Sequence, residues 1–110
     1  MKISKELAKG SNATLILSVL AEEDMYGYKI VKELERRSEY VFSLKEGTMY
    51  PILHALEEGG MVEAYWVDAD ARKRKYYHIT RKGKALLKEK KKEFKVYSQA
   101  VGKVLGIATL

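Results

Sequence analysis

The stretch EGTMYPILHALEEGG, residues 46–60, contains the only proline of this 110-residue chain. Its apolar side chains follow the i, i+3, i+4, i+7 spacing of a helix with one narrow buried face: Met49, Ile52, Leu53 and Leu56. Gly59-Gly60 predicts where that helix ends, because glycine adopts the left-handed stop conformation at little cost. The sequence therefore predicts a helix with Pro51 near its start.

The start of this helix has two interpretations. In the first, Thr48 is the N-cap and Pro51 lies in the first turn, where its missing amide costs little. In the second, the helix begins near Lys45 and Pro51 deprives it of one backbone hydrogen bond. The sequence leaves both open.

The outer face of the same helix is mostly uncharged near its start. Opposite the apolar face, with Tyr50 on the flank, lie Gly47, Pro51, His54 and Glu58. Such a face suits contact with a phosphate chain, since Gly47 lets backbone come close and free helix amides favour phosphate oxygens. Tyr50 offers a ring with a hydroxyl, His54 a donor to a base edge or phosphate, and Lys45 a charge. Alternatively, Tyr50 only packs against a neighbouring hairpin and His54 is an ordinary surface histidine.

Elements on both sides complete a recognisable order. Upstream, Ser11 and Asp24 are predicted N-caps of two helices, and YVFSL (40–44) is predicted to be extended. Downstream, alternating residues predict strands near 62–66 and 76–79, joined by the hairpin loop VDADARKR (67–74), and Thr80 caps a final helix. Three helices, a hairpin and a helix make an α+β, mainly α, winged helix-turn-helix, whose third helix is the expected groove reader.

The final helix carries a seam of large apolar residues spaced 3, 4, 3 and 4 apart: Phe94, Tyr97, Val101, Val104 and Ala108. This spacing is typical of a helix that pairs with another helix, either of a second copy of the chain or of another protein. We assign residues 1–80 to a DNA-binding domain and 81–110 to a dimerisation helix of the same compact unit. Gly102 and Gly106 leave open whether the helix continues to Leu110.

Charge is distributed unevenly along the chain. Residues 1–71 hold 8 lysines and arginines against 13 acidic residues, whereas residues 72–110 hold 13 against 2. A basic block beside an acidic one predicts a polyanionic partner, although a solvated helix face is the simpler explanation. Arg72, Lys73 and Arg74 at the hairpin suit a phosphate backbone or a minor groove.

Several protein classes are excluded by what the sequence lacks. It has no cysteine, which fits a cytoplasmic protein, and no apolar run long enough to span a membrane. Its two histidines, His54 and His78, fall on different elements. With no nucleophile–base pair, metal-ligand spacing or glycine-rich phosphate loop, the sequence predicts no enzyme, no metal site and no cofactor.

Three stretches resemble the PadR family of bacterial and archaeal transcriptional regulators: MYGYKI (25–30), EGTMYPILHALEEGGMVEAYW (46–66) and RKRKYYHITRKGK (72–84). The resemblance implies a repressor that dimerises through its last helix and binds a palindromic operator. Carried over by position, it implies DNA contacts by Tyr28, Lys45, Thr48, Tyr50, Pro51, His54, Arg72, Lys73 and Arg74. This chain differs from the family in having Lys45-Glu46 before Gly47 and Ala71, not glycine, before the wing arginines.

Some members of that family bind flat aromatic effectors at the dimer interface. Phe94 occupies a similar position on the last helix, so the resemblance implies a small aromatic effector there; the alternative is a seam residue packed on its partner. The leading hypothesis is a sequence-specific DNA-binding regulator, a repressor released by a small hydrophobic effector. The rival is a protein-interaction dimer module that does not bind DNA.

Overall fold

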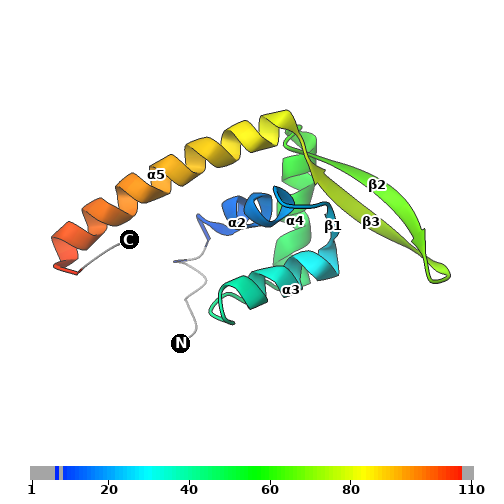
Figure 1. The fold of residues 1–110 in the computed structure, drawn as a ribbon, viewed down its shortest axis with the longest axis horizontal. Coiled ribbons are helices and arrows are strands. Elements are labelled where there is room, and N and C mark those ends of the chain that lie inside the picture. Colours follow the sequence, from blue (N-terminus) through cyan, green and yellow to red (C-terminus); the bar gives the residue numbers. More distant parts are fainter. Residues whose placement is uncertain (1–6, 8, 108–110) are drawn as a thin grey trace.

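The computed structural model describes residue 7 and residues 9–107. In the described residues, three helices are followed by a β-hairpin and a long last helix (Figure 1). A short strand between the first two of these helices pairs with the hairpin and completes a small sheet. The elements are α2 (Asn12–Leu20), β1 (Met25–Tyr26), α3 (Gly27–Arg37), α4 (Glu46–Glu58), β2 (Val62–Ala69), β3 (Arg72–Ile79) and α5 (Arg81–Leu105). The winged helix-turn-helix prediction is confirmed.

The core lies where α2, α3, α4 and the base of the hairpin meet. Its fully buried side chains are Ile16, Leu17, Val19, Leu20, Met25, Ile30, Met49, Leu53 and Val62. The predicted apolar face of α4 is therefore the buried face, with Ile52 only half-buried beside it. Burying the apolar face turns the opposite face of α4 toward solvent, as the sequence predicted.

The start of α4 follows the second interpretation. The helix begins at Glu46 after an extended Lys45, whose carbonyl accepts the Met49 amide at 2.9 Å. Thr48 is thus inside the first turn and is not the N-cap. Pro51 lies within the helix and leaves the Gly47 carbonyl without its usual amide partner. The helix ends as predicted: Gly60 has φ of +77°, and the Met61 amide donates to the Leu56 carbonyl at 2.8 Å.

Two upstream predictions need correction. Asp24 is not the cap of the second helix, because Met25 and Tyr26 pair with Tyr77 and Tyr76 as strand β1 and α3 begins only at Gly27. The predicted extended stretch 40–44 is not extended at its start, because Tyr40 lies in a turn with φ of +66°. Ser11 does occupy the N-cap position of α2, although its side chain makes no capping hydrogen bond.

The hairpin is longer than the sequence predicted and its turn is shorter. Strands β2 and β3 pair from Val62–Ile79 to Ala69–Arg72, so the turn consists of Asp70 and Ala71 alone. Both have positive φ, +48° and +63°, as a two-residue turn of the favoured twist requires. The predicted loop 67–74 is therefore wrong, and Arg72, Lys73 and Arg74 lie on strand β3.

The start of α5 is fixed against the link between α4 and β2. The Thr80 hydroxyl accepts the Gly83 amide at 3.1 Å, which confirms the predicted cap, and lies 2.6 Å from the Gly60 carbonyl. Gly83 packs so closely on the Met61 carbonyl that a Cβ there would collide with it. These contacts fix the base of the hairpin and the start of α5 relative to each other.

The far half of α5 extends beyond the helical body, on the side away from the hairpin (Figure 1). The helix continues through Gly102 and ends at Gly106, which has φ of +73°; the Ile107 amide donates to the Gly102 carbonyl at 2.9 Å. Ala108, the last predicted seam residue, lies outside the described residues. Exposed apolar side chains remain along this half: Phe94, Val96, Tyr97, Val104 and Leu105.

Candidate nucleic-acid interface

The outer face of α4 is open to solvent at its N-terminal end. Tyr50 is 43% exposed, and Gly47, Thr48, Pro51 and His54 are exposed beside it. A Cβ added to Gly47 would meet no atom within 4 Å, so nothing inside the protein requires a glycine there. The predicted set of groove-reading residues thus shares one accessible surface.

Tyr50 is held at one edge by the start of α3. Gly27, the first residue of α3, lies so close to the Tyr50 hydroxyl that a Cβ on it would collide with that group. Partial burial, followed by the charge of Glu46, raises the pKa of Tyr50. The hydroxyl end of the ring therefore packs on α3, and only its remaining surface is available to a partner.

His54 lies one turn further along α4 and is paired within its own helix. Its Nε2 lies 3.1 Å from Oε1 of Glu58, and both side chains are 71% exposed. A carboxylate beside the ring repels phosphate oxygens but accepts hydrogen bonds from base amino groups. This arrangement suits a base edge better than a phosphate.

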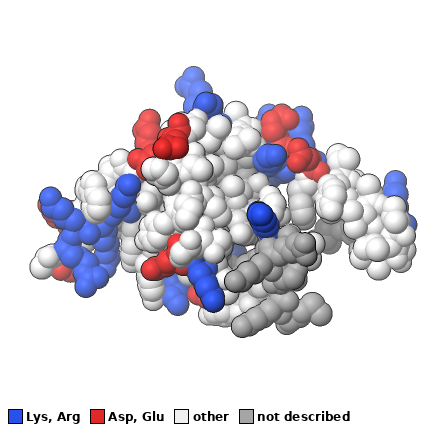
Figure 2. All heavy atoms as spheres, turned by 180° about the vertical axis from the view of Figure 1, so that it is seen from behind, with Lys and Arg blue, Asp and Glu red and all other residues white. Residues whose placement is uncertain are grey.

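The hairpin brings a cluster of cations to the end of the molecule away from the tip of α5 (Figure 2). Arg72 and Lys73 are exposed next to the turn. Arg74 is half-buried, with its guanidinium carbon 4.5 Å from the centre of the Tyr26 ring. Lys75 faces the other way and lies 3.5 Å from Glu57 of α4, so it ties the hairpin to the helix.

Tyr28 lies on the first turn of α3 and is mainly exposed. Its ring stacks on Tyr26 with centroids 6.4 Å apart, and the Lys32 ammonium lies 5.3 Å from its centroid. The residue thus faces solvent at the start of α3, and its predicted contact with DNA stays a prediction.

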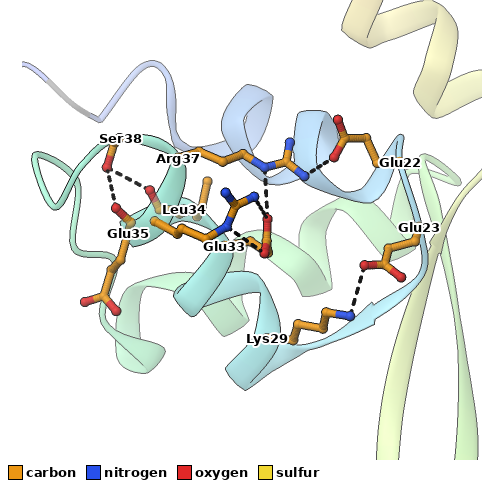
Figure 3. Close-up of polar contacts among 9 residues, drawn as sticks. Glu22, Glu23, Lys29, Glu33, Leu34, Glu35, Arg37 and Ser38 are labelled. Atoms are coloured by element: carbon orange, nitrogen blue, oxygen red, sulfur yellow. Dashed lines mark hydrogen bonds and ion pairs between the residues drawn. The ribbon is translucent and has the colours of Figure 1, made fainter.

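Most cations on α3 are occupied by acids. Arg37 binds both Glu33 and Glu22, and Lys29 lies 3.0 Å from Glu23 (Figure 3). Hydrogen bonds from the neighbouring guanidinium groups lower the pKa of Glu33 to about 2. These pairs join α3 to the loop that follows α2. In the described part of the chain, by contrast, no acidic side chain forms an ion pair with Lys45, Arg72, Lys73 or Arg74.

A polar cluster that sequence reasoning missed fixes the hairpin to the body. Asp24 accepts the Tyr65 hydroxyl at 2.5 Å and lies 2.8 Å from Nδ1 of His78. Burial alone would raise the pKa of Asp24, but hydrogen bonds from Tyr65 and His78 and the charge of His78 together lower it. The bond to Asp24 raises the pKa of Tyr65 to about 12. The partners lie 41 and 54 residues away in sequence, so no local pattern indicates them.

Two properties of the described residues, 7 and 9–107, concern membrane spans and metal sites, neither of which the sequence predicts. None of their helices has both the length and the apolar character needed to cross a membrane. Nor do three or more histidine or acidic side chains gather there as a metal ion would require.

The chain is similar to a family of transcriptional regulators and to several solved structures of such proteins. Residues 16–89 match the transcriptional regulator PadR-like family. An uncharacterised protein of Lysinibacillus sphaericus is 40% identical over 93 residues, or 84% of this chain and 85% of that protein. A transcriptional regulator from Clostridium thermocellum has a TM-score of 0.85 at 33% identity, covering 92% of this chain and 96% of its own. A PadR family transcriptional regulator from Eggerthella lenta DSM 2243 has a TM-score of 0.80 at 34% identity, covering 91% and 86%.

The Asp24 cluster predicts a pH-dependent contribution to stability. Because the pKa of Asp24 is lowered on folding, its contribution is present above its ordinary value of 3.8 and is lost as the pH falls through the lowered pKa. Asp24→Ala should lower the free energy of unfolding by up to about 1 kcal/mol near neutral pH, and by nothing in strong acid.

Urea unfolding at a series of pH values measures this difference. Asp68→Ala, which removes an exposed carboxylate from the same hairpin, is the matched control and should change stability little at any pH. If Asp24→Ala lowered the free energy of unfolding equally in acid and at neutral pH, the charge of Asp24 would play no part in stability.

Proposed function

The chain belongs to the PadR-like family of transcriptional regulators, and from this we propose that it is a homodimeric repressor that reads a palindromic operator with the outer face of α4. Membership of the family makes it a DNA-binding regulator. Repression, the dimer, the operator symmetry and the residues in contact with DNA are the proposal.

The open face at the start of α4 carries this proposal. It presents Thr48, Tyr50, Pro51 and His54 together, around a glycine that the protein's own packing does not need. Glycine in place of alanine costs a helix roughly 0.5–1 kcal/mol. A partner whose backbone comes close to Gly47 supplies a reason for keeping it, and a DNA groove is such a partner.

Cations on either side of that face supply the phosphate contacts. Lys45 precedes α4, and Arg72, Lys73 and Arg74 lie on strand β3 of the hairpin. Contacts of this kind strengthen binding to every duplex and make it sensitive to salt. Tyr28 adds a hydroxyl at the start of α3 for the same backbone. Base recognition then falls to α4, with His54, whose side chain is 71% exposed, as one of its donors.

The seam on α5 supports a dimer formed through the last helix. Phe94, Tyr97 and Val104 are exposed along its extended half, with Val104 88% exposed. Together with Ala100, Val101 and Leu105, Tyr97 and Val104 line a shallow apolar groove. A second copy of α5 covers these side chains in our proposal, with residues 1–80 as the DNA-binding part and 81–110 as the dimerisation part. The two α4 helices would then lie about 34 Å apart, one turn of DNA.

The division between phosphate and base contacts predicts different effects of two substitutions. Arg74→Ala should weaken binding to all duplexes similarly and reduce the slope of log affinity against log salt by about 1 for each subunit bound. His54→Ala should alter the preference among sequences and leave that slope unchanged. Fluorescence anisotropy at two or more salt concentrations measures both.

Lys88→Ala removes an exposed cation from α5 and is the control for charge alone. The reverse result, in which His54 controls the salt slope and Arg74 the sequence preference, would overturn the assignment of roles. Absence of binding to any duplex at low salt would favour a protein-interaction module.

The dimer predicts that a charge on the seam produces monomers. Val104→Asp would bury a carboxylate between two apolar helices, which is strongly unfavourable. Sedimentation equilibrium should find the wild type dimeric and this variant monomeric. Val96→Asp, at another exposed apolar residue on a different face of α5, is the matched control and should stay dimeric. A monomeric wild type, or a dimeric Val104→Asp variant, would contradict a dimer formed through the seam.

The effector belongs to the same proposal and rests on Phe94. Its ring is 60% exposed at the start of the seam, where a flat aromatic molecule could stack between two copies. Titration with a polycyclic aromatic fluorophore should give saturable binding to the wild type and a loss of about tenfold or more in Phe94→Ala, since each 1.4 kcal/mol corresponds to tenfold. Equal binding by both proteins would eliminate this role and leave Phe94 as a packing residue.

A further inference from the structure

A row of four tyrosine rings crosses the outer face of the sheet and continues onto α3. Neighbouring ring centroids are separated by 5.8 Å between Tyr65 and Tyr76, 5.4 Å between Tyr76 and Tyr26, and 6.4 Å between Tyr26 and Tyr28. This tyrosine row is formed by the strand register, which places Tyr76 opposite both Tyr65 and Tyr26. Each ring restricts the next, so the position of Tyr26 is fixed from both sides.

We call the three hairpin residues Arg72, Lys73 and Arg74 the wing cations. Of these, Arg74 is the one whose side chain contacts the tyrosine row. It precedes Tyr76 by two residues on β3, so the two side chains share one face of the sheet and Arg74 is diagonal to Tyr26. Its guanidinium carbon is 4.5 Å from the centre of the Tyr26 ring. Among the described contacts, neither Arg72 nor Lys73 has an aromatic neighbour of this kind.

Stacking on a ring leaves the donors of a guanidinium free. The contact with the ring takes up no hydrogen-bond donor, so the five N–H donors of the Arg74 guanidinium stay available to other partners. No acidic side chain in the described part of the molecule forms an ion pair or hydrogen bond with Arg74, in contrast to Arg36 and Arg37 on α3. The guanidinium is therefore held in place and still able to bind an anion.

We propose that Tyr26 is a positioning residue that holds the Arg74 guanidinium between the hairpin and the start of α3, ready for a DNA phosphate. This inference rests on the proposed function and adds a division of labour among the wing cations. Arg74 binds one phosphate from a fixed position, and Arg72 and Lys73 attract the backbone from mobile side chains. Tyr26 itself does not touch DNA.

A double-mutant cycle tests this coupling. The probe is a fluorescein-labelled duplex of arbitrary sequence, roughly three helical turns long, because a phosphate contact needs no operator. Tyr26→Leu should weaken binding about 2- to 5-fold for each subunit bound, the range of a cation–π contact. In an Arg74→Ala background the same substitution should have no effect, since nothing remains for the ring to hold.

Arg72→Ala provides the matched background. Tyr26→Leu should weaken binding there as much as in the wild type, because Arg72 does not use the ring. Equal weakening in both backgrounds would mean that Tyr26 only supports the fold, and would overturn the inference. Tyr26→Phe keeps the ring and should bind like the wild type; a loss equal to that of Tyr26→Leu would also overturn it.

Arg74→Lys tests the same coupling if Tyr26→Leu fails to fold. Lysine keeps the charge but lacks the planar group that stacks and presents several donors at once. It should preserve the salt slope and weaken binding by about the same 2- to 5-fold. Wild-type affinity in Arg74→Lys would overturn the inference. A wild type that binds no duplex would instead remove the proposed function itself.

Discussion

The close contact between Tyr50 and Gly27 determines how α4 sits on α3. Glycine allows the Tyr50 hydroxyl to lie where any other residue would place a side chain. The neighbouring Met49 is fully buried, so this turn of α4 belongs to the core on one side and to the solvent-facing surface on the other. The packing of the core therefore fixes the position of the α4 residues that we propose enter the DNA groove.

The hairpin is attached to this unit by several independent contacts. Asp24 links the turn before β1 to β2 and β3, Lys75 links β3 to α4, and the tyrosine row links the sheet to α3. At the base, Gly83 fits α5 against the Met61 carbonyl. With the hairpin, α3 and α4 held together, the proposed phosphate contacts and base contacts keep a fixed relation to each other.

Local patterns predict the helices and the hairpin, but not strand β1, the full length of the hairpin or the contacts between elements. A few neighbouring residues are enough to predict the apolar face of α4, its end at Gly59-Gly60 and the Thr80 cap. The contacts that position the site join distant residues: Gly27 with Tyr50, and Asp24 with Tyr65 and His78. Strand β1 was missed because two residues carry no periodicity, and the turn at Asp70-Ala71 was missed because it lacks the glycine that marks such turns.

The central claim is that two copies joined along α5 present two α4 helices to successive turns of one duplex. Selection of bound duplexes from random DNA, followed by sequencing, tests it most directly. The account predicts enrichment of inverted half-sites with centres about 10 base pairs apart, one helical turn. Enrichment of a single unpaired motif, or no enrichment at all, would contradict it.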